Sequence, residues 1–318
     1  MRGIAAVAVV AFHIHGGGYV LQSSLARNAW LAVDFFFVLS GFVIAASYGA
    51  RLAAGFPVRR YMLLRLGRVY PLHLATLALY LLSEGGRYFG GVSAGTPRVP
   101  FVGSRSVGTL GLTALLVNGF WPTGAQWWNG QSWSISIEVW LYLAMAGIWR
   151  LAGRKAATVA MALALVAMAA LGIADALPQP PFSSFLLRGM GGFGVGVACW
   201  HLRERRLIPR PMRAATGLEI AAAAIALAAI AWPHPGVWRT AGTDLAFAVV
   251  VWVFAEQRGA LSRVLTKAPF VFLGTISYSI YMTHQFVAHR FIDGLRLVGL
   301  GTMVLGEGDP DRRIMARR

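Results

Sequence analysis

Residues 1–13 read Met1-Arg2-Gly3-Ile4-Ala5-Ala6-Val7-Ala8-Val9-Val10-Ala11-Phe12-His13, an apolar stretch that carries two ionisable side chains. The step from Arg2 to His13 is about three turns, or roughly 16 Å, of α-helix, so both side chains lie on one face. Ionisable groups inside a membrane span are costly and usually mark a functional site. The stretch therefore predicts a membrane helix whose polar face takes part in chemistry.

The composition predicts an all-α, polytopic membrane protein with a bundle of about ten transmembrane helices. Hydrophobic residues make up 57% and charged residues 13% of the 318 positions, which is far from the balance of a soluble domain. The net charge of +17 comes largely from arginines that lie between apolar stretches, as the positive-inside rule expects. This pattern indicates membrane lipid rather than nucleic acid as the surroundings of the protein. The single cysteine excludes an internal disulfide.

Ten apolar stretches are candidate spans, and basic clusters separate several of them. The stretches are 3–20, 30–48, 69–83, 107–120, 133–149, 156–174, 185–202, 214–232, 241–256 and 269–290, with a weaker one at 291–306. The four basic clusters lie within 51–68, 150–155, 203–213 and 258–267, and all of them fall on one side only if 107–120 does not cross the membrane. That stretch is short and polar enough for a re-entrant or interfacial segment. We therefore expect one transmembrane domain over 1–306, with both ends cytoplasmic and a short basic tail over 307–318.

Residues 84–132 are expected to form an external or re-entrant segment. They contain many glycines together with Trp121, Trp127 and Trp128. Two interpretations stay open for these tryptophans. They are either an interfacial aromatic belt or platforms for a sugar ring in a lid over the site.

Arg2 and His13 form the first candidate site. A histidine accepts a proton readily near neutral pH, so His13 is a candidate general base for a hydroxyl group. The alternative is that Arg2 is a snorkelling anchor and His13 a core residue with satisfied hydrogen bonds.

Arg65 and Arg68 form the second candidate site, within Arg65-Leu66-Gly67-Arg68. A spacing of three residues places them next to each other on a helix, and arginine binds phosphate with a bidentate fork. They indicate either a cytoplasmic site for a phosphorylated donor or only a topology signal.

Ser134, Glu138 and Tyr142 recur at intervals of four residues and therefore share one helix face. A carboxylate within a span is unlikely to face lipid. Glu138 is expected either to orient or charge His13, or to bridge helices structurally. No metal-ligand spacing, glycine-rich phosphate loop or nucleophile elbow occurs in the sequence, and no metal is expected.

Two further groups complete the candidate set. Asp34 lies in Val33-Asp34-Phe35-Phe36-Phe37-Val38-Leu39-Ser40-Gly41-Phe42 and is expected to pair with an arginine or with His13, or to contact substrate. Ser277, Tyr281 and His284 share a helix face, where packing roles and substrate binding are both open. His73 and His15 are interpreted as structural.

Together these motifs resemble the integral-membrane acyltransferase family 3, which includes O-antigen and other surface-polysaccharide acetylases. Arg2 and His13 resemble its Arg-x10-His signature, and Val33–Phe42 resembles its second-helix motif. Arg65-x-x-Arg68 is similar to its basic motif. Trp133-Ser134 through Glu138 and Tyr142, and Ser277 through His284, resemble two later motifs.

The resemblance implies a membrane-bound O-acyltransferase that moves an acyl group, usually acetyl, from cytoplasmic acyl-CoA to a hydroxyl of an extracytoplasmic carbohydrate or glycolipid. It implies a multi-pass protein of the cytoplasmic (inner) membrane. It also implies that Arg2 and His13 are essential and that Arg65 and Arg68 serve the donor.

These implications complete the expected roles. His13, Arg2 and Glu138 are assigned to catalysis and Arg65 and Arg68 to acyl-CoA. The residues expected to bind substrate are Asp34, Trp133, Tyr142, Tyr281 and His284. We further expect one continuous polar cavity lined by Arg2, His13, Asp34, Glu138 and Tyr142 and open to both sides of the membrane.

Two alternative functions stay open. A transporter or flippase for a polar or lipid-linked solute also needs charged groups at a midplane site. An inactive family member is the other, because the sequence after His284 lacks the final apolar helix that the resemblance leads us to expect.

Overall fold

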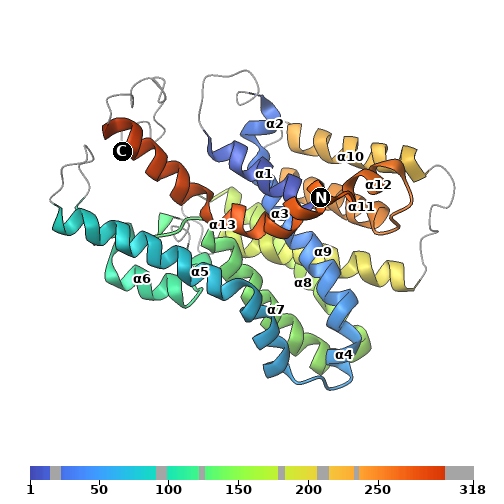
Figure 1. The fold of residues 1–318 in the computed structure, drawn as a ribbon. Helices are drawn as coiled ribbons and strands as arrows, with labels where there is room; N and C mark the ends of the chain where they lie inside the picture. Colours follow the sequence, from blue (N-terminus) through green and yellow to red (C-terminus); the bar gives the residue numbers. More distant parts are fainter. Residues whose placement is uncertain are drawn as a thin grey trace.

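The computed structural model describes residues 1–14, 23–90, 99–121, 126–177, 183–205, 215–232 and 236–297, and within them all regular secondary structure is helical (Figure 1). His15 and the tail over 307–318 lie outside these residues. The longer helices are α1 (Arg2–His13), α3 (Ala32–Ile44), α5 (Val58–Phe89), α7 (Ser132–Ala152), α8 (Ala156–Asp175), α9 (Ser184–Glu204), α10 (Ala215–Ala231), α11 (Val237–Phe254) and α13 (Ala268–Leu297). The short ones are α2 (Ser24–Arg27), α4 (Ala50–Ala53), α6 (Val107–Ala114) and α12 (Ala260–Leu265).

The apolar stretches coincide with helices, although several boundaries differ. Helix α5 begins at Val58, so the basic cluster that was expected to precede a span is helical itself. Helix α6 ends at Ala114 after 8 residues. At 1.5 Å per residue it is about 12 Å long and too short to cross a hydrocarbon core of about 30 Å.

Three segments of the described residues are long and apolar enough to cross a membrane: Ala29–Ala53, Ser132–Asp175 and Val237–Phe254. Helices α1 and α10 are apolar but shorter. The protein is therefore an all-helical membrane protein, and a bundle of about ten spans stays a prediction. The longer helices α5, α9 and α13 carry arginines and histidines that lower their hydropathy.

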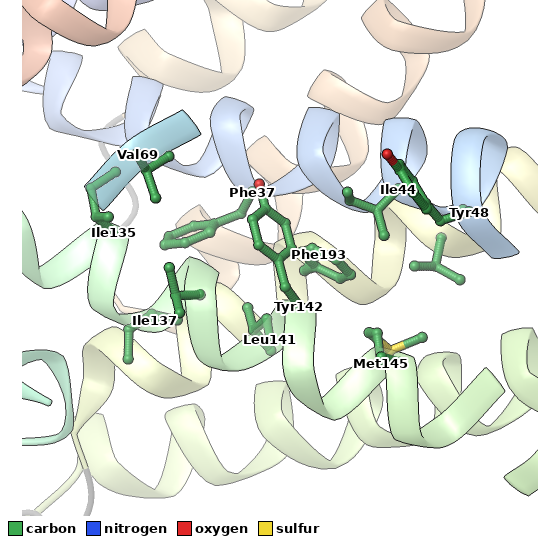
Figure 2. Close-up of a cluster of buried hydrophobic side chains, with 14 of the residues drawn as sticks. Phe37, Ile44, Tyr48, Val69, Ile135, Ile137, Leu141, Tyr142, Met145 and Phe193 are labelled. Atoms are coloured by element: carbon green, nitrogen blue, oxygen red, sulfur yellow. The ribbon is translucent and has the colours of Figure 1, made fainter. Parts of the chain in front are cut away.

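Close contacts between helices centre on α9, which packs against α3 and α8. A side chain at Gly196 would place its Cβ 2.0 Å from the carbonyl oxygen of Val38, and one at Gly41 would lie equally close to that of Phe193. Glycine at both positions lets the two backbones touch. Aromatic residues fill the space beside this contact, and Figure 2 shows Phe37, Tyr142 and Phe193 grouped where α3, α7 and α9 meet.

Residues 99–121 and 126–132 fold back against the end of α5. Trp127 and Trp128 are buried with Leu77 and Tyr80 in one apolar cluster, and only Trp121 is well exposed, at 47%. Buried indoles cannot serve as an interfacial belt or as sugar platforms, so both interpretations fail for Trp127 and Trp128. A buried ion pair between Arg105 and Glu84 fixes the segment to α5.

Candidate functional site

One cavity of about 230 Å³ contains three arginines that come from two helices. Arg2 lies at the start of α1, and Arg65 and Arg68 lie on one face of α5. We call it the arginine cavity. The predicted face of α7 also lines it, since Ser134, Glu138 and Tyr142 all reach it. Four-residue spacing on a regular helix brings these three side chains to the same wall.

Glu138 is held in the arginine cavity by two hydroxyl groups. Tyr142 donates a 2.5 Å hydrogen bond to Oε1 of Glu138, and Ser40 of α3 donates to the same oxygen. The expected role of Glu138 in orienting His13 finds no counterpart in these contacts, because Glu138 faces the arginines. Ser40 was not among the expected site residues, although its place in the Val33–Phe42 motif is a signal for it.

Arg65 is positioned by Tyr48. Its Nη2 donates to the hydroxyl of Tyr48 at 3.0 Å, and its guanidinium lies 4.7 Å from the centroid of that ring. Nε of Arg65 is buried and has no hydrogen-bond partner among the residues that the structure describes. A buried unpaired donor is costly, so an acceptor supplied by a ligand would be favourable here.

His13 lies in a second cavity of about 200 Å³, which we call the histidine cavity. Its Nδ1 lies 2.8 Å from the carbonyl oxygen of Val9, one turn back on α1. A carbonyl can only accept, so Nδ1 is the donor, and in the neutral form of the ring Nε2 is then the acceptor. Nε2 lies 3.2 Å from Nε2 of Gln131, whose amide is the donor. Gln131 is a site residue that the sequence analysis missed.

Tyr281 and His284 of α13 lie near different parts of the site, Tyr281 in the arginine cavity and His284 beside His13. Nδ1 of His284 donates to the carbonyl oxygen of Tyr281 at 2.8 Å, and its Nε2 lies 3.3 Å from Nδ1 of His13. The Tyr281 hydroxyl lies 2.7 Å from Oγ of Ser134 and lines the arginine cavity together with Ser277. The motif from Ser277 to His284 therefore serves two places: Ser277 and Tyr281 line the arginine cavity, and His284 lies beside His13.

Asp34 is part of a buried ion pair. Nη2 of Arg188 in α9 lies 3.0 Å from each carboxylate oxygen, and Asp34 is fully buried. This satisfies the expectation of an arginine partner, but it corrects the assignment to substrate binding, because Asp34 lines neither cavity. Trp133 lines the histidine cavity and stacks on Phe185 with ring centroids 4.4 Å apart.

A second buried acid lies beside this pair. Asp244 of α11 is fully buried, and neither of its carboxylate oxygens has a hydrogen-bond partner among the described residues. Asp34 and Arg188 are close enough to act on its charge. A Cβ at Gly192 would lie 3.2 Å from Oδ1 of Asp244, so glycine keeps α9 close to this carboxylate.

The single continuous cavity that we expected is thus two cavities. Arg2, Glu138 and Tyr142 line the arginine cavity, and His13 lines the histidine cavity. Val33 borders both, so the wall between them is thin. Arg2 and His13 on α1 consequently face different cavities.

Comparisons with known proteins agree with these motifs. The sequence model of acyltransferase family 3, described as an acyltransferase domain, matches residues 1–306. One curated relative, "Protein 2 in picA locus" of Rhizobium radiobacter, is 40% identical over 80 residues, which is 25% of this chain and 40% of the relative. The aligned region thus spans less than half of that relative. No solved structure matches the chain. The family match covers nearly the whole sequence, and the chain belongs to acyltransferase family 3.

Proposed function

We propose that the protein is an acyl-CoA-dependent O-acyltransferase that acts on a hydroxyl of an extracytoplasmic carbohydrate or glycolipid. The observation that carries this proposal is the pairing of a cavity with three arginines and a neighbouring cavity with a histidine. Arginines bind phosphate groups, and a neutral imidazole accepts the proton of a hydroxyl nucleophile. The class of enzyme is that of the family, and the donor and the acceptor are the proposed part.

In the donor half of the site, Arg65 and Arg68 bind the phosphates of acyl-CoA, with acetyl-CoA as the expected donor. Nε of Arg65 and the Arg68 guanidinium supply the hydrogen-bond donors. Arg2 lies in the same cavity and positions the acyl end of the donor. The carboxylate of Glu138 offsets part of the positive charge of the three arginines in this small cavity. Its two hydroxyl partners hold it in place.

In the acceptor half of the site, Nε2 of His13 removes the proton of the attacking hydroxyl. The hydroxyl oxygen then forms a bond to the thioester carbonyl carbon, and the carbon–sulfur bond breaks. The proton on His13 passes to the departing CoA thiolate, so the products are an ester and free CoA. General-base assistance of this kind is typically worth about 10²–10⁴-fold in rate.

The membrane placement follows from the same proposal. Basic residues lie in the first part of α5 and directly before α8, and we assign that side to the cytoplasm, where acyl-CoA is made. The protein would then be a multi-pass protein of the cytoplasmic (inner) membrane.

The direct test is release of free CoA from acetyl-CoA by the purified protein when a carbohydrate acceptor is added. We expect acceptor-dependent CoA release in the wild type and none in His13→Ala, with both proteins equally folded in detergent. CoA release that is unchanged in His13→Ala would contradict the proposed base. Transport of an intact solute without CoA release would contradict the proposed enzyme.

A further inference from the structure

The histidine cavity is lined mainly by aromatic and amide side chains, which are not the groups that bind the phosphates of acyl-CoA. Of its described lining residues, Phe12, Trp30, Trp133 and Phe185 are aromatic, and Gln131 and Gln285 carry amides. Aromatic residues combined with amide and imidazole groups suit an apolar ring that bears hydroxyls. They are a poor match for phosphate, which favours charged donors.

Arg188 is the only described lining residue of this cavity with a permanent charge, and that charge is already matched. Asp34 receives two hydrogen bonds from it at 3.0 Å, and the guanidinium lies 4.4 Å from the centroid of the Trp30 ring. Nε of Arg188 has no hydrogen-bond partner among the described residues and can donate to a neutral hydroxyl oxygen, while the charge of the guanidinium is paired with Asp34.

Asp244 adds a second carboxylate behind this wall. Its carboxyl oxygens have no hydrogen-bond partner among the described residues, so nothing there stabilises a charge on Asp244, and the ion pair of Asp34 with Arg188 sums to no net charge. An anionic group brought into the adjacent cavity would lose its hydration and meet no unpaired cation among the described lining residues.

We propose that the histidine cavity is the acceptor subsite and that it selects a neutral, polyhydroxylated sugar ring over an acidic sugar. This inference rests on the proposed function and adds the location of the acceptor and its charge class. Gln285 and Trp30 are its binding residues, while Gln131 holds the base. The arginine cavity stays reserved for the donor.

The first experiment compares matched acceptors. Purified protein with acetyl-CoA is given the methyl glycosides of glucose, galactose and mannose, and separately the three corresponding methyl uronides, while free thiol is measured. We expect at least one neutral glycoside to stimulate CoA release, with kcat/KM at least about tenfold above that of its uronide. A uronide equal to or better than its neutral partner would overturn the proposal.

The remaining outcomes separate the two proposals. If water alone discharges acetyl-CoA in the wild type and no glycoside adds to that rate, the sugar subsite is wrong and the donor site stands. If no CoA is released under any condition, the proposed function itself fails.

Variants then test the location. Gln285→Ala should raise the KM for the active glycoside about 3- to 10-fold and leave the KM for acetyl-CoA unchanged, as expected for one lost neutral hydrogen bond. Gln126→Ala is the matched control, because Gln126 is exposed. Trp30→Ala and Trp121→Ala distinguish this cavity from the exposed tryptophan of the 99–121 segment. A raised acceptor KM in Trp121→Ala alone would overturn the assignment.

Discussion

His13 and Gln131 meet through their Nε2 atoms, which lie 3.2 Å apart, although 118 positions separate them in the sequence. The amide donates to the lone pair that the proposed base uses, so it holds the ring in place while the cavity is empty of acceptor. An arriving hydroxyl must replace or share this contact.

Gln131→Ala is therefore expected to lower kcat while leaving the KM for acetyl-CoA unchanged. The loss of one neutral hydrogen bond is worth about 1 kcal/mol, which corresponds to a fall of about fivefold. Steady-state CoA release at saturating donor measures it, with Gln126→Ala as the control. A change in the donor KM alone would contradict a positioning role for Gln131.

The arginine cavity gives a prediction for the donor. Arg65→Ala and Arg68→Ala should each raise the KM for acetyl-CoA about tenfold or more, because charge-assisted hydrogen bonds are worth about 1.5–3 kcal/mol. Arg59→Ala is the matched control, since Arg59 lies nearer the start of α5, is exposed and does not line the cavity. Equal donor KM values in all three variants would leave Arg65 and Arg68 as topology signals only.

The two buried acids should respond differently to replacement by asparagine. Asp34→Asn leaves Arg188 as a buried charge without its carboxylate partner, so we expect a loss of about 3–5 kcal/mol in the free energy of unfolding. Asp244→Asn replaces a carboxyl group that has no hydrogen-bond partner among the described residues, so stability should be unchanged. Thermal unfolding of both variants in one detergent checks this order, and equal destabilisation would contradict it.

The contact between α3 and α9 predicts a strict need for glycine. Gly196→Ala would bring Cβ within 2.0 Å of the Val38 carbonyl oxygen, and overpacking of this kind costs about 1–3 kcal/mol. Gly217→Ala in α10 is the control, since nothing lies within 4 Å of its added Cβ. The midpoint of thermal unfolding should fall only in Gly196→Ala. A similar fall in both variants would point to a general effect of alanine rather than to the close contact.

Helical periodicity accounts for what the sequence could predict of the site. Ser134, Glu138 and Tyr142 line one cavity because spacing fixes a helix face, and Arg65 and Arg68 follow the same rule. The short α6 was expected from its length and polarity. These features depend on neighbours within one helix, where the sequence pattern is sufficient.

Helical periodicity does not predict which residues meet between different helices. Arg188 and Asp244 are ionisable residues within expected spans, a signal that marks both, but periodicity does not indicate that they gather at Asp34. The separation of Arg2 and His13 into two cavities has the same origin. One helix face turns toward different neighbours at its two ends, because α5 and α7 border Arg2 and the Gln131 segment borders His13.

This separation leads to a prediction about sidedness. The rise of an α-helix places His13 about 16 Å from Arg2, which is about half of a hydrocarbon core of roughly 30 Å. A donor in the arginine cavity and an acceptor in the histidine cavity would then approach the thin wall at Val33 from opposite directions.

In sealed vesicles of known protein orientation, transfer should occur when acetyl-CoA is on the side of Arg65 and the glycoside is on the other. Exchanging the sides of acetyl-CoA and the glycoside should abolish acyl transfer, and permeabilising the vesicles should restore it. Transfer that requires both substrates on one side would show that the acyl group does not cross the membrane during the reaction, even if CoA release and the arginine phenotypes are as expected.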